Sequence, residues 1–529
     1  MLKFVDDCRI EPVGELAERL ALNLGRLSAE CYRPATIYTM DQAGWPGDWE
    51  GRTILALVSL WNALDTKPAY LDPIMEGLPE HLNAEGYLGP VSDGRFDEQR
   101  LSGHNWLVRG LCEYWLRTGD NAVRDIILRI VRSLYLPLRG QYRTYPVDPD
   151  LRAEIGSYGG TISVESGRWR LSTDIGCAYM CLDALSQVYE LFRLPEVLEL
   201  LDEMIGTFTA IDFVGAHMQT HATLSATRGI LRLAEALRDV DDAASARYLA
   251  AGRSIFDLYL KRGMTENYAN FNWFGRPDTW TEPCAIVDSM MVALALFRLT
   301  EDQTYLTLAN RIWYNALGYA QRPNGGFGTD SCVGPAGDVL RPSGDGISEA
   351  FWCCTMRGSE GLRARAMHSV LKGVDGRGGN EFWLPFATDV NITSPRLTAV
   401  VRSGLPAEGR YKITLAAKAR FRGALNVYTP AGIDRHELDL APGEELTLES
   451  SFDLPLTRER TADGRRFKYL RGDLLLGRSV SDTGDNSPAG EFGASFAGDN
   501  VPSGLAPLLN MRDLPLDLAS RDRRRVLFE

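Results

Sequence analysis

Two short stretches of the sequence bring sulfur and carboxylate side chains close together. The stretch TEPCAIVDSMM places Glu282 and Cys284 two positions apart, and EAFWCCTMRG contains the adjacent thiols Cys353 and Cys354. Zn²⁺ accepts thiolate and carboxylate ligands and prefers four donors in a tetrahedral arrangement. These four residues could therefore supply a complete zinc site, assembled between two loops.

A structural explanation of the same cysteines is open as well, because free cysteine behaves as a small apolar residue and is often buried. The position of the second pair favours a site. Cys353 and Cys354 follow a loop rich in Gly and Pro and precede a helical pattern that begins near Thr355. A helix N-terminus stabilises a thiolate, and so does a nearby cation such as Arg357. Three thiolates and one carboxylate around Zn²⁺ would carry excess negative charge, so we expect a shared proton or a compensating cation.

The elements that must position these residues are predicted to be helices over the first two thirds of the chain. Between about residues 50 and 370, apolar residues recur at three and four positions, separated by short turns of Thr, Gly, Asp and Pro. Helical hairpins bury both of their faces when they close into a ring. We therefore expect an α/α barrel of the (α/α)6 type. The predicted hairpins span 54–75, 106–131, 179–205, 226–256 and 289–317.

After about residue 372 the pattern changes to short runs of β-forming residues between Gly, Pro and Asp turns. Runs at intervals of roughly ten residues are typical of an antiparallel β-sandwich. The sequence thus predicts a multidomain α+β protein, with the barrel over 1–371 and the sandwich, a C-terminal loop and a tail over 372–529. The stretch 481–500 has only the composition of a loop. The predicted strands are 396–404, 410–419, 424–432, 444–454 and 466–477.

The bulk composition excludes several classes of protein. The chain of 529 residues is 45% hydrophobic with a net charge of −13, which indicates a soluble globular protein and disfavours a nucleic-acid partner. The N-terminus lacks an apolar signal region, and no long uninterrupted apolar run predicts a membrane span. We therefore expect a cytoplasmic protein. Its nine cysteines form no regular framework, which favours free or metal-bound thiols over disulfides.

The segment 266–317, together with the sequence FWCC, resembles glycoside hydrolase family 127, whose best-known members are β-L-arabinofuranosidases. In that family a Glu-x-Cys pair and a Cys-Cys pair hold zinc. The resemblance implies that Glu282, Cys284 and Cys354 are zinc ligands and that Cys353 is both ligand and nucleophile. The family's acid/base is a glutamate sixteen residues before the Glu-x-Cys glutamate, which implies Glu266 here.

Two further segments carry the resemblance and imply sugar-binding residues. The sequences SGHNWLVRG and GAHMQTHATLSATRG are similar to family segments with histidines that contact sugar hydroxyls, which implies these roles for His104 and His217. Hydrogen-bonded core roles for both histidines remain the alternative. The aromatic residues Trp273 and Trp280 could stack on a sugar ring or belong to the core. Cys332 precedes the Cys-Cys pair and is a candidate substitute ligand.

The chain also departs from the family pattern at several positions. Thr355 replaces the proline that usually follows the Cys-Cys pair, and Gln219 replaces an asparagine. Asp174 or Thr173 stands where the family has a further histidine. These changes leave the four predicted metal ligands in place and concern the specificity for the sugar.

The resemblance implies a zinc-dependent retaining glycosidase with a cysteine nucleophile, acting on a small carbohydrate such as a β-L-arabinofuranoside. One alternative is a non-catalytic sugar-binding protein with structural zinc. Another is a different sugar-active α/α-barrel enzyme, such as a lyase or an epimerase. A homodimer is compatible with a sandwich of this kind, and we expect no nucleic-acid or membrane partner.

Overall fold

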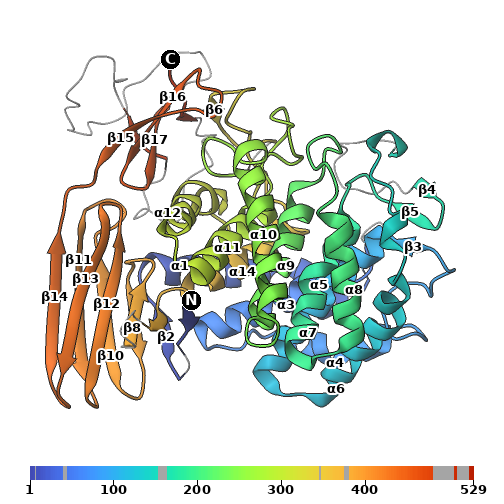
Figure 1. Ribbon diagram of the computed structural model, residues 1–529, viewed down its shortest axis with the longest axis horizontal. Helices are drawn as coiled ribbons and strands as arrows, with labels where there is room; N and C mark the ends of the chain where they lie inside the picture. Colours follow the sequence, from blue (N-terminus) through green and yellow to red (C-terminus); the bar gives the residue numbers. More distant parts are fainter. Residues whose placement is uncertain are drawn as a thin grey trace.

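A computed structural model shows the helices gathered in one part of the molecule and most strands in another (Figure 1). The sandwich strands lie at the left of this view, and a further sheet of shorter strands lies above them near the C-terminus. The structure describes the whole chain except residues 6, 40–43, 153–163, 345–346, 375–379, 481–504 and 509–523.

Each predicted helical hairpin is present as a pair of helices. Polar residues in the turns account for their ends. Asp120, for example, caps the helix that follows it by accepting a hydrogen bond from the Ala122 N–H, and Gly119 ends the preceding helix in a left-handed conformation. The principal helices are α1 (Glu15–Leu27), α3 (Asp48–Leu64), α4 (Leu71–His81), α5 (Glu98–Thr118), α6 (Asn121–Ile130), α7 (Cys181–Phe192), α8 (Pro195–Phe208), α9 (Thr220–Leu237), α10 (Asp242–Arg262), α11 (Pro283–Thr300), α12 (Gln303–Ile312) and α14 (Cys354–Met367).

The helices of the described residues form two concentric layers. The inner helices α3, α5, α7, α9, α11 and α14 each pack on the next, and α14 packs back on α3, so the inner ring is closed. The helices α1, α4, α6, α8, α10 and α12 pack outside them. This arrangement confirms the predicted α/α-barrel fold.

The inner helix α11 illustrates the burial of this layer. Among the described residues it is the one helix long and apolar enough to cross a membrane, with a mean hydropathy of 1.5. However, 83% of its apolar window is buried inside the protein. Its apolar character is therefore accounted for by packing in the barrel.

Charged side chains from five inner helices pair at the centre of the ring. Arg109 of α5 contacts Asp183 of α7 at 3.0 Å and Glu360 of α14 at 2.9 Å. Arg228 of α9 contacts Asp288 of α11 at 2.7 Å and the same Glu360 at 2.6 Å. All five side chains are buried, and a buried charge is tolerated only when it is paired. We call these five residues the central ion network.

The strands form two main sheets that face each other as a sandwich. The strand orders are β1-β7-β8-β12-β13 and β14-β11-β10-β9-β2. Neighbouring strands are antiparallel except β8 and β12, which are parallel, so the predicted antiparallel sandwich holds with this exception. The strands are β1 (Lys3–Phe4), β2 (Arg9–Pro12), β7 (Leu371–Val374), β8 (Asn380–Leu384), β9 (Val390–Thr393), β10 (Leu397–Ser403), β11 (Arg410–Ala417), β12 (Phe421–Thr429), β13 (Gly432–Leu440) and β14 (Glu445–Ser451).

The first residues of the chain belong to these sheets. Strand β1 pairs with β7, and β2 pairs with β9. The predicted barrel of residues 1–371 includes β1 and β2, whereas the structure pairs these two strands with strands of the sandwich. The reason is physical: strands of two and four residues are too short to show an alternating pattern.

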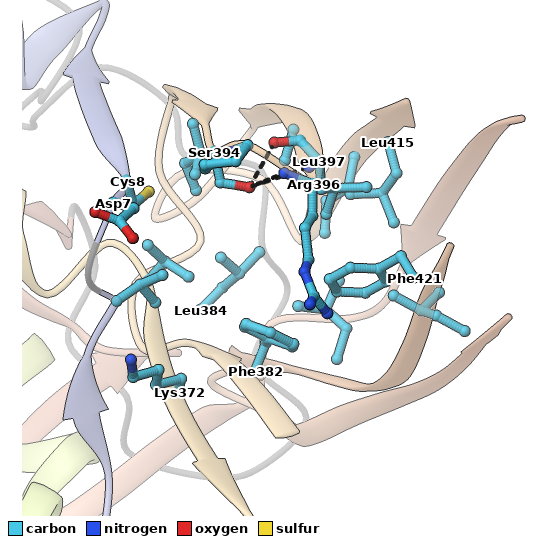
Figure 2. Close-up of a pocket in the computed structure, with 18 residues that line it drawn as sticks. Asp7, Cys8, Lys372, Phe382, Leu384, Ser394, Arg396, Leu397, Leu415 and Phe421 are labelled. Carbon is cyan, nitrogen blue, oxygen red and sulfur yellow. Dashed lines mark hydrogen bonds between the residues drawn. The ribbon is translucent and has the colours of Figure 1, made fainter. Parts of the chain in front are cut away.

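A partly open pocket of about 410 Å³ lies between the two sheets of the sandwich. Figure 2 shows Phe382, Leu384 and Phe421 of one sheet and Leu397 and Leu415 of the other lining it. Apolar side chains from both sheets thus surround a space between the layers.

A third sheet joins the C-terminal strands to the barrel loops, in the order β15-β16-β17-β19-β6. Strand β6 comes from the connection between α12 and α14, so this sheet fastens a loop of the barrel to the end of the chain. The predicted loop 481–500 lies outside the described residues. The strands are β15 (Leu456–Arg460), β16 (Phe467–Arg471), β17 (Leu474–Ser479), β19 (Arg524–Arg525) and β6 (Val339–Leu340).

The central ion network gives a prediction about stability. The substitution Asp183→Asn keeps the shape of the side chain but leaves Arg109 with one fewer buried anion, so we expect a loss of about 3–5 kcal/mol in the free energy of unfolding. Denaturant titration measures it. The control Glu449→Ala removes an exposed partner of Lys412 and should cost less than about 1 kcal/mol. Equal effects of the two substitutions would contradict a stabilising role for the network.

Candidate functional site

The N-termini of two neighbouring inner helices meet at one point of the barrel. Glu282 is the N-cap of α11, followed by Pro283 and Cys284 in its first turn. Cys353 is the N-cap of α14, and Cys354 is the first residue of that helix. A helix N-terminus carries partial positive charge, which stabilises anionic side chains. Both helices therefore direct this end at the same four donor groups.

The four donor groups are close enough to hold one metal ion. Their ligand atoms all lie within 4.8 Å of one another. The sulfur of Cys354 lies 3.6 Å from that of Cys284 and 3.4 Å from that of Cys353. In a tetrahedral zinc site with Zn–S bonds of about 2.3 Å, two sulfurs are roughly 3.8 Å apart. The donor types and spacing therefore fit a cation such as Zn²⁺, and the predicted cluster is present.

The four groups differ in exposure. Cys284 and Cys354 are fully buried, while Glu282 and Cys353 are only partly buried. Cys353 is therefore the sulfur of the cluster that an external molecule can reach most easily.

The thiols also differ in acidity. Hydrogen bonds from the thiols of Cys284 and Cys354 lower the pKa of Cys353 to about 5, in spite of its burial. Burial raises the pKa of Cys284 to about 11 and that of Cys354 well above its ordinary value. Burial, together with the nearby Cys284, also raises the pKa of Glu282. Of the three thiols, Cys353 is therefore the one that is ionised at neutral pH in the metal-free protein.

Polar neighbours orient the carboxylate of the cluster. The amide of Gln219 donates to Glu282 Oε2 at 3.4 Å, while its oxygen caps α9 by accepting from the Ala222 N–H. The backbone N–H of Glu282 donates to the side-chain oxygen of Asn270 at 3.0 Å. Gln219, which replaces the family's asparagine, thus connects the N-terminus of α9 to the predicted metal ligand.

The predicted aromatic pair lies beside these residues. Trp273 and Trp280 pack edge to face, with ring centroids 5.2 Å apart. Trp273 forms a β-bridge with Gln219, and its indole N–H donates to Asp174 at 3.2 Å. Burial raises the pKa of Asp174 to about 6. Asp174, one of the two residues at the position of the family's further histidine, is therefore a titratable group near the site.

Glu266 lies where the barrel meets the third sheet. Its Oε2 accepts a hydrogen bond from Lys468 Nζ at 2.9 Å, and its Oε1 accepts one from the Ala462 N–H at 2.6 Å. Its own N–H donates to the carbonyl of Val333. Lys468 lies in β16 and Ala462 in the turn between β15 and β16. The sequence alone predicted neither partner, because both are distant in the chain from Glu266.

The two predicted sugar-binding histidines have different surroundings. His104 is fully buried, its Nε2 accepts from the Leu88 N–H at 3.0 Å, and its Nδ1 donates to the carbonyl of Arg100 at 2.9 Å. Burial lowers its pKa to about 4. Both ring nitrogens of this neutral histidine are thus engaged by the backbone, which agrees with the alternative of a core role. His217 is only partly buried, and its Nδ1 lies 3.3 Å from the carbonyl of Phe274.

The remaining cysteines lie outside the cluster. Cys332 donates to the carbonyl of Asn270 at 3.5 Å and is not one of the four clustered donors. All nine cysteines are free thiols in the structure, as the sequence predicts.

Two residues near the cluster had no signal in the sequence. Arg52 of α3 donates to the sulfur of Cys284 at 3.7 Å. His221 of α9 bonds Asp288 through Nδ1 at 2.7 Å, and its buried Nε2 has no hydrogen-bond partner among the described residues. Both reach the site from other helices, so only ring closure places them there.

The comparisons with known proteins give the same architecture. No protein-family model and no curated protein matches the chain. A β-arabinofuranosidase of glycoside hydrolase family 127 matches with a TM-score of 0.62 at 13% identity, over 90% of this chain and 84% of that one. A family 127 β-L-arabinofuranosidase from Geobacillus stearothermophilus T6 gives 0.57 at 14%, over 89% and 81%. Another glycoside hydrolase gives 0.59 at 14%, over 92% and 85%. The resemblance to the family is thus confirmed for the fold.

The acidity of Cys353 is testable in the metal-free protein. Because its pKa is lowered to about 5, its thiolate is present above that pH and is lost as the pH falls through it. Alkylation by iodoacetamide, followed at this residue by mass spectrometry, should have a midpoint near pH 5. In Cys284→Ala the midpoint should move to higher pH, because one hydrogen-bond donor is gone. A midpoint near the ordinary value of about 8.5 in the unmodified protein would refute this assignment.

Proposed function

We propose that this protein is a retaining glycoside hydrolase that uses Cys353 as its nucleophile within a zinc site. The observation that carries the proposal is the convergence of Glu282, Cys284, Cys353 and Cys354 at two helix N-termini, with Cys353 as a partly accessible sulfur. Apolar packing alone does not account for a carboxylate among three sulfurs. Metal binding explains why three sulfurs and a carboxylate share one small space.

In the proposed reaction, Cys353 attacks the anomeric carbon while Glu266 donates a proton to the departing oxygen. A glycosyl-cysteine is formed and the alcohol is released. Glu266 then accepts a proton from water, which attacks the same carbon and frees the sulfur of Cys353. When bound, Zn²⁺ would keep the sulfurs deprotonated and would stabilise the sulfur as it departs.

The contacts of Glu266 fix its position and suit its role as the base of the second step. A general acid must keep one geometry through both steps, and Lys468 and Ala462 hold the two carboxylate oxygens from the third sheet. Lys468 can also compensate the charge that Glu266 carries after it has given up its proton.

For the substrate we propose a small carbohydrate with a furanose ring, with β-L-arabinofuranosides as the first choice. Two of the similar structures bear the name of β-arabinofuranosidases, which supports this choice. In the site, the partly exposed Trp280 offers an aromatic surface suited to the C–H face of a sugar, and the buried Trp273 packs against it edge to face.

The proposed metal gives a direct prediction. Purified protein should contain one zinc per chain by elemental analysis. The variants Cys284→Ser and Cys354→Ser should lose most of it, because each removes a fully buried donor. The control Cys112→Ala changes a buried cysteine of α5 and should retain the zinc. Full zinc in both serine variants would place the metal elsewhere.

The proposed catalysis is tested with a panel of aryl furanosides and pyranosides. Cys353→Ser should keep the fold and lose turnover, while the control Cys8→Ser should remain active. Glu266→Gln should lose about 10²–10⁴-fold in kcat/KM on substrates with poor leaving groups. With strongly acidic phenols the loss should shrink, because such groups leave without a proton. Loss of zinc without loss of activity would point to a structural metal. An unsaturated product would indicate a lyase, and isomerisation without release of the aglycone an epimerase.

A further inference from the structure

The candidate metal centre carries more negative charge than one divalent ion can neutralise. Metal binding requires deprotonated ligands, so Glu282, Cys284, Cys353 and Cys354 would contribute four negative charges. With Zn²⁺ the sum remains negative, in a place where two of the sulfurs are fully buried. Uncompensated buried charge is costly. A cation at the cluster is therefore needed.

Arg52 supplies such a cation in direct contact with a donor atom. Its Nη1, on α3, donates a hydrogen bond to the sulfur of Cys284 in the first turn of α11 at 3.7 Å. The residue is buried, with an exposed fraction of 5%. A hydrogen bond from a charged donor to an anion is stronger than a neutral one, and little water is present here to screen it.

The position of the guanidinium is fixed on its other sides. Its Nε donates to Asp48 Oδ1 at 2.7 Å, one helical turn earlier on α3. Its Cζ lies 4.2 Å from the ring centroid of Trp106 on α5. Asp48 occupies Nε and Trp106 contacts the guanidinium plane, so a terminal nitrogen is left for the sulfur. A planar fork of this kind distinguishes arginine from lysine.

A second arginine near the same ring is engaged differently. Arg357 of α14 lies 4.5 Å from the Trp106 centroid, but its guanidinium pairs with Asp288 and with Glu360. Arg357 is thus held by two carboxylates of the central ion network, whereas Arg52 pairs with one carboxylate, that of Asp48. Among the described residues, Arg52 is the arginine that donates a hydrogen bond to a sulfur of the cluster.

We propose that Arg52 is a positioning residue of the metal centre, which offsets the excess negative charge through its N–H···S contact with Cys284 and thereby raises the affinity for a divalent ion. This inference rests on the metal site of the proposed function but does not require glycosidase activity. Hydrogen bonds to metal-bound sulfur and outer contacts of the ligands commonly set metal affinity.

The test measures metal binding directly. Metal-free protein is titrated with Zn²⁺ against a chromophoric chelator, and with Co²⁺, whose thiolate charge-transfer absorption reports sulfur coordination. Arg52→Met should weaken Zn²⁺ binding about 10–100-fold and alter the Co²⁺ spectrum. Arg52→Lys keeps the positive charge but lacks the planar guanidinium. Its Zn²⁺ affinity should lie between those of the unmodified protein and Arg52→Met. If Arg52→Met does not fold, Arg52→Gln, which removes the charge but keeps a polar side chain at this position, should still weaken binding.

The matched control is Arg298→Met. Arg298 is also a buried arginine with a carboxylate partner, Glu235, and an aromatic ring, Phe4, but it lies near the other end of α11. Its loss should leave Zn²⁺ affinity unchanged. Equal affinities of the unmodified protein and Arg52→Met would overturn the role of Arg52 and leave the proposed function standing. Failure of the unmodified protein to bind either ion would overturn both.

Discussion

The meeting of two helix N-termini is the constraint on which the rest of the structure depends. Glu282 and Cys284 open α11, and Cys353 and Cys354 open α14. These helices are successive members of the inner ring, so the cluster forms where they pack on each other, and closure of the ring brings Arg52 of α3 to it. The barrel therefore acts as the scaffold that fixes the donor geometry before any metal arrives.

Closure of the ring also decides what lies beneath the cluster. Helices that are buried all round must pair every charge they carry, and the central ion network does so with residues from five of them. The cluster and the network share neighbours, because Arg52 and Arg357 lie at one tryptophan ring. A polar core of this kind ties the electrostatics of the site to the packing of the barrel.

Much of the fold could be predicted from the sequence, since helical periodicity is local. The four clustered donors could be found because their residue types are rare and their spacing is distinctive. Strand β13 was not predicted, because GIDRHELDL carries charges where a buried strand has apolar residues. The parallel pairing of β8 with β12 depends on tertiary structure, as do the contacts of Arg52 and Lys468. No local pattern records which distant helix will bring a cation to a sulfur.

The pairing of β1 and β2 with later strands has a consequence for how the chain folds during synthesis. Both leave the ribosome long before their partners β7 and β9, which follow more than three hundred residues later. Until then the barrel must assemble with β1 and β2 unpaired. Contacts between residues so far apart in the sequence slow folding. A fragment that starts after the barrel would present β7 and β9 as bare sheet edges, which favours self-association.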